Sequence, residues 1–215
     1  MTFFEGAWLF IGQQLRKPAG FGGDLLARAL GLINERSNRI AIAALDITLN
    51  DTVLELGFGT GRAIRVIATA AAEGRVFGID HSPTMCFRAS RRLRHAIPDG
   101  RVRLVHGSLR KLPWPESAVD KCLAVHVAYF MDEKQVREAR RVLRIGGRLA
   151  VLVTDKAAMG RWKFAHPGTH RLFAASDLTK LLLDGGFSRE EMCLQNVSLG
   201  MAIPGLLALA IKSAP

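Results

Sequence analysis

The feature that most constrains the fold is a glycine-rich turn between an apolar strand and a helix. Residues 53–56 are mostly apolar, as expected for a parallel strand that helices cover on both faces. Three glycines follow at alternate positions, Gly57, Gly59 and Gly61. Glycine lacks a Cβ atom, so such a turn can adopt positive φ and let a ligand lie against the backbone. A helical pattern over residues 62–73 then places free helix N–H groups beside that ligand.

A second predicted strand, residues 75–79, ends at Asp80, nineteen residues after Gly61. An acid at the end of the second strand can accept hydrogen bonds from the two hydroxyls of a ribose. A dinucleotide-binding turn has its third glycine one residue later, where Arg62 stands, and Glu55 is poorly suited to a pyrophosphate. An acid at this place suits a ligand with an ammonium group. S-adenosyl-L-methionine has a ribose, a sulfonium and an α-amino group but no phosphate, and it fits this spacing.

With these residues the chain resembles the class I S-adenosylmethionine-dependent methyltransferases, of the small-molecule, lipid or quinone type, over roughly residues 45–212. The resemblance implies that Glu55 orients the cofactor amine, Asp80 binds the ribose and Met85 packs on the adenine. Ser108 replaces the acid that usually accepts from the adenine amine, and a hydroxyl accepts more weakly than a carboxylate. The expected cofactor-binding residues are Glu55, Gly57, Phe58, Gly59, Gly61, Asp80, His81, Met85, Gly107, Ser108, Leu109 and His126.

The remaining pattern predicts an α/β fold, with a doubly wound and mostly parallel sheet. Strands are expected at residues 51–56, 75–79, 101–105, 119–125 and 147–154, with helical stretches between them. Ser82 and Asp132 are expected to cap helices, and the last helix is expected at residues 176–184. The apolar run 197–211 is broken by glycine and proline and is too short to span a bilayer. We expect it to form a hairpin that adds an antiparallel end, giving the Rossmann-like sheet of seven strands that the resemblance implies.

The domain organisation expected is one compact methyltransferase unit, residues 46–215, preceded by an N-terminal helical cap region, residues 1–45. A chain of 215 residues can bury a single core, and a hydrophobic content of 49% excludes a mainly disordered protein. The cysteines are widely spaced, with no C-x-x-C pair, so we expect neither a disulfide framework nor a bound metal. With no signal-peptide pattern at the N-terminus, these features predict a cytoplasmic location.

Candidate catalytic residues follow the fourth predicted strand, because such sheets bind ligands at the carboxyl ends of their strands. A sulfonium methyl group is already activated, so positioning supplies much of the acceleration, and a base is needed only if the acceptor loses a proton. His126 is the candidate base and Tyr129 the candidate catalytic hydroxyl. Each has a structural alternative, since His126 can shape the pocket through hydrogen bonds and Tyr129 can form an aromatic wall. The segment 155–170 is expected to recognise the acceptor or, alternatively, to pack as a surface loop.

The net charge of +11 is concentrated in two arginine-rich stretches, residues 88–111 and 137–148. Such an excess of positive charge attracts polyanions. Together with the bulky apolar residues of segment 3–11, it favours peripheral binding to an anionic membrane surface. A helix that caps the pocket and a solvated basic face are the alternatives. Nucleic acid is not favoured as a partner, because no row of aromatic residues accompanies the arginines.

The predicted function is methyl transfer from S-adenosyl-L-methionine to a small acceptor, hydrophobic or lipid-like in character. Three alternatives stay open at this point: a nucleic-acid methyltransferase, a nicotinamide-dependent oxidoreductase, and a protein that binds the cofactor without catalysis. The sequence identifies neither the acceptor nor the atom that is methylated, and it does not set the oligomeric state.

Overall fold

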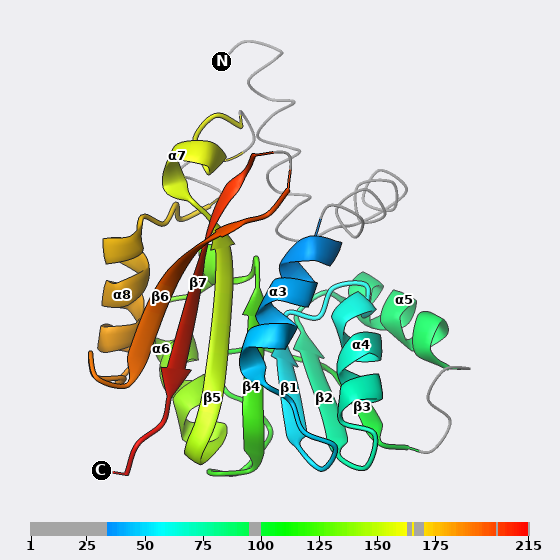
Figure 1. The fold of residues 1–215 in the computed structure, drawn as a ribbon. Helices are drawn as coiled ribbons and strands as arrows, with labels where there is room; N and C mark the ends of the chain where they lie inside the picture. Colours follow the sequence, from blue (N-terminus) through cyan, green and yellow to red (C-terminus); the bar gives the residue numbers. More distant parts are fainter. Residues whose placement is uncertain (1–33, 95–99, 163–164, 166–169, 201, 215) are drawn as a thin grey trace.

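The computed structural model of the protein describes residues 34–94, 100–162, 165, 170–200 and 202–214. In these ranges the chain forms a seven-stranded sheet with helices on both faces (Figure 1). The strand order is β3-β2-β1-β4-β5-β7-β6, and the first five strands along the chain run parallel. Strand β7 pairs antiparallel with both β5 and β6. The predicted doubly wound α/β sheet with an antiparallel end is confirmed.

The strands lie close to where the sequence predicts them. They are β1 (Thr52–Leu56), β2 (Arg75–Asp80), β3 (Val102–His106), β4 (Val119–Val125), β5 (Leu143–Thr154), β6 (Met192–Ser198) and β7 (Pro204–Ile211). Strand β5 starts four residues earlier than expected because Leu143 pairs with Val119 across an irregularity in the ladder. The hairpin also starts earlier than expected, at Met192. Its first strand alternates between half-buried and exposed residues at the sheet edge, so it lacks the continuous apolar run of β7.

The described helices are α3 (Glu35–Leu45), α4 (Arg62–Ala70), α5 (Pro83–Leu93), α6 (Glu133–Val142), α7 (Lys156–Met159) and α8 (Ala175–Asp184), with a short 3₁₀ turn η1 (Ala128–Phe130). Three of the described helices, α5, α6 and α7, begin after a residue whose side chain accepts from a free helix N–H. The Ser82 hydroxyl accepts from the Met85 N–H at 3.4 Å. The Asp132 carboxylate accepts from the Lys134 N–H at 3.0 Å, while the Gln135 side chain accepts from the Asp132 N–H at 2.7 Å. Both predicted caps are therefore confirmed.

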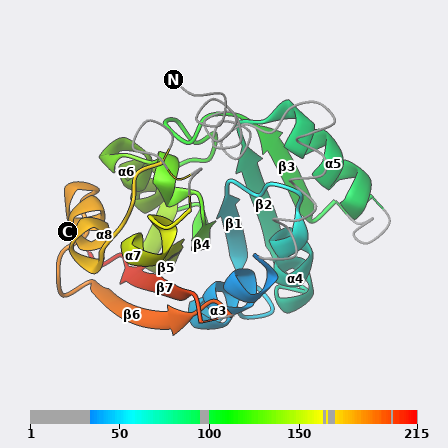
Figure 2. The ribbon, with the colours of Figure 1, turned by 90° about the horizontal axis from the view of Figure 1, so that it is seen from above.

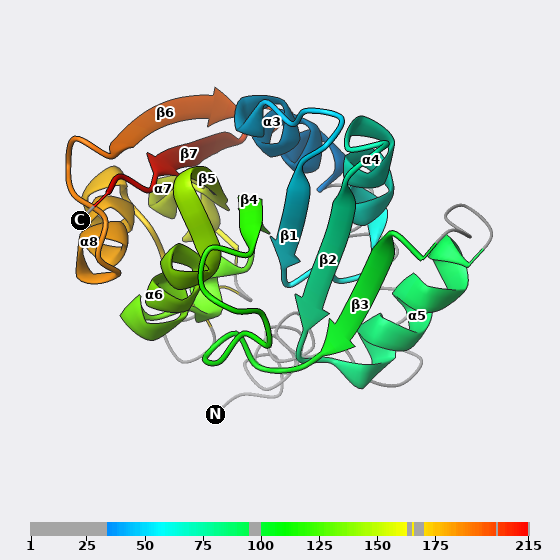
Figure 3. The ribbon, with the colours of Figure 1, turned by 90° about the horizontal axis from the view of Figure 1, so that it is seen from below.

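Two layers of helices bury the two faces of the sheet. Helices α3, α4 and α5 cover one face, whereas α6 and α8 cover the other, as Figure 2 shows from above and Figure 3 from below. Successive strand residues point to opposite faces. Thus Val53 and Leu123 join the core under α3 and α4, while Leu54 and Cys122 join the core under α6 and α8.

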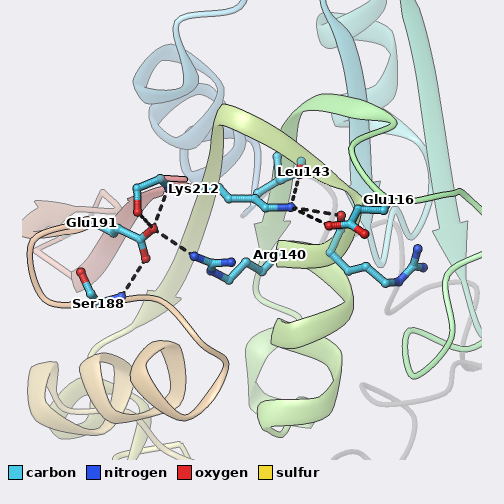
Figure 4. Close-up of polar contacts among 8 residues, drawn as sticks. Glu116, Arg140, Leu143, Ser188, Glu191 and Lys212 are labelled. Carbon is cyan, nitrogen blue, oxygen red and sulfur yellow. Dashed lines mark hydrogen bonds and ion pairs between the residues drawn. The ribbon is translucent and has the colours of Figure 1, made fainter. Parts of the chain in front are cut away.

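Buried charged groups close the antiparallel end of the sheet (Figure 4). Glu191, only 9% exposed, accepts from the Ser188 N–H at 2.8 Å and from Arg140 at 3.1 Å. Lys212 is 6% exposed, and its Nζ donates to the Leu143 carbonyl at 2.8 Å. Because each buried charge has partners, its burial leaves no uncompensated ion. These contacts fix the end of β7 to α6 and β5, far from the carboxyl ends of the parallel strands.

Some predictions fall outside the described residues. Residues 1–33 of the expected cap region lie outside them, as do residues 163–164 and 166–169 of the expected acceptor segment. The boundary between cap region and main unit stays a prediction, and so does the cytoplasmic location. In the described part of the chain, no helix has the length and apolarity needed to cross a membrane.

Candidate functional site

The carboxyl ends of four parallel strands bring the predicted cofactor residues to one edge of the sheet (Figure 1). Strand β1 lies between β2 and β4, and β2 lies between β1 and β3. The Gly57 N–H donates to the Ile79 carbonyl at 2.8 Å, and the Gly107 N–H donates to the Asp80 carbonyl at 2.9 Å. The glycine turn after β1 and the segment 107–109 after β3 therefore flank the end of β2.

The three glycines of the turn have different structural roles. All have positive φ, as the sequence predicts: +71° at Gly57, +53° at Gly59 and +74° at Gly61. A Cβ atom on Gly57 would lie 2.7 Å from the Val127 side chain, and one on Gly61 would lie 3.0 Å from that of Ala89. No described atom lies within 4 Å of a Cβ built on Gly59. Packing inside the protein thus requires Gly57 and Gly61, whereas Gly59 leaves backbone open to a ligand.

Glu55 is the most unusual group at this edge. The residue is 4% exposed, and its Oε2 atom has no hydrogen-bond partner among the described residues. Burial, and then the charge of Asp80, raise the pKa of Glu55 well above its usual range, although a hydrogen bond from the Ile64 N–H opposes them. Leaving a buried polar atom unpaired is costly, and more so when the group is charged. A ligand ammonium group at Oε2 would remove that cost.

Asp80 connects the glycine turn to the start of α5. Its carboxylate is buried, and it accepts from the Gly59 N–H through Oδ2 and from the Ser82 N–H through Oδ1, both at 2.8 Å. Each carboxylate oxygen has a second lone pair, so the group can still accept from ribose hydroxyls. The sequence predicts the ribose contact but not this second role, in which the acid holds the turn in place.

Two of the predicted cofactor residues lie largely within the protein. Phe58 is 3% exposed and belongs to the core under α3 and α4. Its ring packs beside β2, since a Cβ atom on Gly78 would lie 2.7 Å from it. Met85 is 4% exposed in the first turn of α5. The adenine contact expected of Met85 stays a prediction. The Phe58 side chain packs in the core.

The cofactor-binding candidates that follow β2 and β3 directly are more exposed. Ser108 is exposed, and its hydroxyl accepts from the Arg110 N–H at 3.2 Å. Leu109 packs against the core under α6 and α8. The His81 side chain is 50% exposed, while the His81 carbonyl lies 3.1 Å from Nε2 of His106. Segment 107–109 is therefore anchored at both sides, and the Ser108 hydroxyl stands at its surface.

The two candidate catalytic residues form a hydrogen-bonded chain. His126 has φ of +55°, which is uncommon for a residue with a side chain, and it follows β4 directly. Its Nδ1 lies 3.1 Å from the Tyr129 hydroxyl, and its Nε2 lies 3.0 Å from the Ser37 hydroxyl on α3. The Tyr129 hydroxyl accepts from the buried Thr154 N–H at 2.7 Å. This chain links α3, the end of β4 and the end of β5.

His126 can bond both hydroxyls in either neutral tautomer. A neutral imidazole donates from one ring nitrogen and accepts at the other, and the hydroxyls of Tyr129 and Ser37 can each donate or accept. Burial lowers the pKa of His126 to about 4 and raises the pKa of Tyr129 to about 12. Both groups are therefore neutral at neutral pH, and both ring nitrogens of His126 have hydroxyl partners.

Comparisons with known proteins give the family. Residues 53–147 match the family model described as a methyltransferase domain. The uncharacterized methyltransferase YdaC of Bacillus subtilis is 32% identical over 127 residues, which are 58% of this chain and 68% of the relative. The chain belongs to the S-adenosylmethionine-dependent methyltransferases. The predicted enzyme class and the predicted cofactor, S-adenosyl-L-methionine, are thereby confirmed.

Two further similar proteins have described acceptors. A demethylmenaquinone methyltransferase of Thermotoga maritima is 33% identical over 135 residues, 60% of this chain and 55% of the relative. A geranyl diphosphate methyltransferase, solved in complex with the cofactor, has a TM-score of 0.72 at 14% identity, covering 91% of this chain and 92% of that one. The second likeness is one of fold alone. This methyltransferase spans about half the length of most of its curated relatives.

Sequence reasoning missed three residues of the methyltransferase site. They are Ser37, which bonds His126, Thr154, whose N–H bonds Tyr129, and Val127, which packs on Gly57. None lies in a motif, and Ser37 is 89 residues away from its partner along the chain. Such pairings depend on how the elements pack rather than on local pattern. Among the described residues, no group of three His, Cys, Asp or Glu side chains is arranged to hold a metal ion.

Proposed function

We propose that this chain transfers the methyl group of S-adenosyl-L-methionine to a small acceptor that is hydrophobic or lipid-like. The observation that carries the proposal is Glu55, on the strand that leads into the glycine turn, whose buried Oε2 has no partner among the described residues. When bound, the cofactor supplies an activated methyl group on a sulfonium. Glu55 binds its amine, and Asp80 holds the ribose while it also fixes the turn. Met85 packs on the adenine ring, and the Ser108 hydroxyl accepts a hydrogen bond from the adenine amine.

His126 and Tyr129 position the acceptor side of the site in this proposal. Their chain of hydrogen bonds is complete, with a neutral imidazole and a neutral phenol. Such a pair is better suited to shape a pocket than to remove a proton at neutral pH, because an efficient base has a pKa near the working pH. Transfer therefore relies on proximity and alignment, which supply much of the acceleration when the methyl group is already activated.

The acceptor class rests on similar proteins and on chemistry. The demethylmenaquinone and geranyl diphosphate methyltransferases are named for acceptors with apolar isoprenoid parts. Tyr129 and Phe173 are buried in the core, whereas the half-buried Phe130 lies edge-on to Tyr129 just after β4. Aromatic rings line most pockets for apolar ligands, and a hydrophobic acceptor beside Phe130 fits this pattern.

The experiment measures transfer of a labelled methyl group from S-adenosyl-L-methionine to a panel of acceptors. The panel contains an isoprenoid quinone precursor, a prenyl diphosphate, a fatty acid, transfer RNA and duplex DNA. We expect label in one of the apolar small molecules, and its loss in Glu55→Gln at low cofactor concentration. Label in nucleic acid alone would contradict the acceptor class. Cofactor binding with no transfer to any of a broad set of acceptors would support the non-catalytic alternative.

A further inference from the structure

The structure separates the two arginine-rich stretches of the sequence. Stretch 137–148 is bonded to groups of the protein itself: Arg137 to the Asp184 carbonyl, Arg140 to Glu191, Arg141 to Glu138, Arg144 to Asp120 and Arg148 to Asp46, at 2.6–3.3 Å. Four of these five arginines are paired with carboxylates of the fold. The stretch therefore carries less unpaired positive charge than its sequence alone indicates.

The remaining excess gathers on two neighbouring helices, α4 and α5. Neither helix contains an acidic residue, and together they hold five arginines: Arg62, Arg65, Arg88, Arg91 and Arg92. The start of α4 contacts α5, since a Cβ atom on Gly61, the residue before α4, would lie 3.0 Å from Ala89 and 3.3 Å from Leu93. Both lie on the same side of the molecule (Figure 2, Figure 3). The two helices therefore form a basic region without acidic residues of its own.

The charges of this basic region repel one another. Partial burial, and then the guanidinium groups of Arg62 and Arg65, lower the pKa of Arg92. In the part of the chain that the structure describes, Arg65, Arg91 and Arg92 make no ion pair with an acid. Glu35 on α3 lies near this group, but its ion pair is with Arg39 at 2.5 Å. An external anion would relieve this repulsion.

Large apolar side chains stand among these charges. Phe87 on α5 is 64% exposed and Val66 on α4 is 44% exposed. The Arg91 guanidinium lies 5.8 Å from the centre of the Phe87 ring. Bulky apolar groups beside arginines are the composition of helices that lie in a membrane interface, where the apolar groups enter the boundary of the acyl chains. A nucleic acid would use the charges but would leave the aliphatic Val66 without a partner.

We propose that the α4–α5 basic face, formed by Arg65, Val66, Phe87, Arg91 and Arg92, docks on an anionic lipid membrane. The guanidinium groups meet the lipid headgroups, and Phe87 inserts between them. Helix α5 begins at Pro83, three residues after Asp80, so docking would hold the cofactor edge of the sheet near the membrane surface. The proposal concerns binding alone and does not depend on the acceptor.

The test is co-sedimentation of the full chain with vesicles of phosphatidylcholine alone and of phosphatidylcholine mixed with phosphatidylglycerol. Each basic side chain near an anionic surface supports binding, and three of them together change the affinity on the order of a hundredfold at low salt. We therefore expect the triple variant Arg65→Gln, Arg91→Gln, Arg92→Gln to lose about that factor on the anionic vesicles. Phe87→Ser should remove the part of the binding that persists at high salt, since apolar burial is not screened.

The matched control is Lys134→Gln, Lys180→Gln, Arg189→Gln, which removes the same charge from α6, α8 and the turn before β6. This control should bind anionic vesicles nearly as the natural chain does. Circular dichroism melting curves of both triple variants should overlay, because all six substituted side chains lie at the surface. Equal losses in the two triple variants, or none in either, would overturn the proposal. So would binding to a DNA or RNA duplex with no binding to anionic vesicles.

Discussion

The substitution Glu55→Gln should make the protein more stable without cofactor and weaker at binding it. Glu55 is 4% exposed, its Oε2 has no partner among the described residues, and Asp80 adds a repulsive charge. An unsatisfied buried polar group costs about 1–3 kcal/mol, and more when it is charged. Glutamine keeps the shape and can still accept from the Ile64 N–H. Its amide nitrogen stays unpaired where Oε2 was, so the gain comes only from removing the buried charge and its repulsion by Asp80. We expect it to raise the free energy of unfolding by about 1–3 kcal/mol at pH 8.

The pH dependence of this gain has a defined sign. The folded-state pKa of Glu55 is raised, so the folded protein binds a proton more readily than the unfolded chain does. The stability that this group contributes is therefore full below its unfolded pKa and is lost as pH rises through the folded pKa. Hence the gap between Glu55→Gln and the natural protein should widen as pH rises and close as pH falls. Urea unfolding followed by circular dichroism at several pH values measures it.

Glu55→Gln should weaken cofactor binding, although it raises the stability of the free protein. Hydrogen bonds to charged groups are worth about 1.5–3 kcal/mol, so losing the bond to the amine should weaken binding by about 10- to 100-fold. Isothermal titration calorimetry with S-adenosyl-L-homocysteine measures this change. Glu73→Gln, an exposed acid just beyond α4, is the matched control and should alter neither quantity. A less stable Glu55→Gln protein, or unchanged affinity, would refute the reasoning.

Four further predictions concern Asp80, Ser108, Tyr129 and His126. Asp80→Ala leaves the Gly59 and Ser82 N–H groups unpaired, so it should lower both the melting temperature and the cofactor affinity, the latter by about 1–3 kcal/mol; a loss of affinity without loss of stability would contradict its role in holding the turn. Ser108→Asp should keep or improve cofactor affinity while Ser108→Ala lowers it modestly, as calorimetry would show; equal affinities for all three proteins would exclude contact with the adenine amine. Tyr129→Phe leaves the buried Thr154 N–H without its partner, and urea unfolding should show a loss of about 1–3 kcal/mol. His126 has a pKa lowered to about 4, so the stability it contributes is present above pH 6.5 and is lost as pH falls toward 4; NMR titration of its ring near pH 6.5 would contradict this.

The sequence predicts those parts of the fold that local pattern encodes. Apolar runs give the strands, and Ser82 and Asp132 give the helix starts, because a cap needs only residues within one turn. The start of strand β6 has no local signal, since an edge strand with alternating exposure carries no continuous apolar run. Its beginning at Met192 depends on pairing with Ala210 of β7.

The candidate site shows the same division. Glu55 and Asp80 are predicted because they stand at fixed distances from a glycine turn. The sequence does not predict that Gly57 and Gly59 have different roles, because the Val127 side chain that packs on Gly57 comes from the segment after β4. Contacts that join distant segments, such as the one from His126 to Ser37, have no local signature. Likewise, the sequence shows two arginine-rich stretches, and only packing tells which of them is already paired within the fold.

The measurement that tests the central claim most directly is a crystal structure of the protein with S-adenosyl-L-homocysteine bound. We predict the ligand amine within about 3 Å of Glu55 Oε2 and the ribose hydroxyls within the same distance of the Asp80 carboxylate, the usual lengths of such hydrogen bonds. The methionine part should lie along Gly59. A ligand bound elsewhere, or one bound at this edge with Glu55 Oε2 still unpaired, would contradict the account.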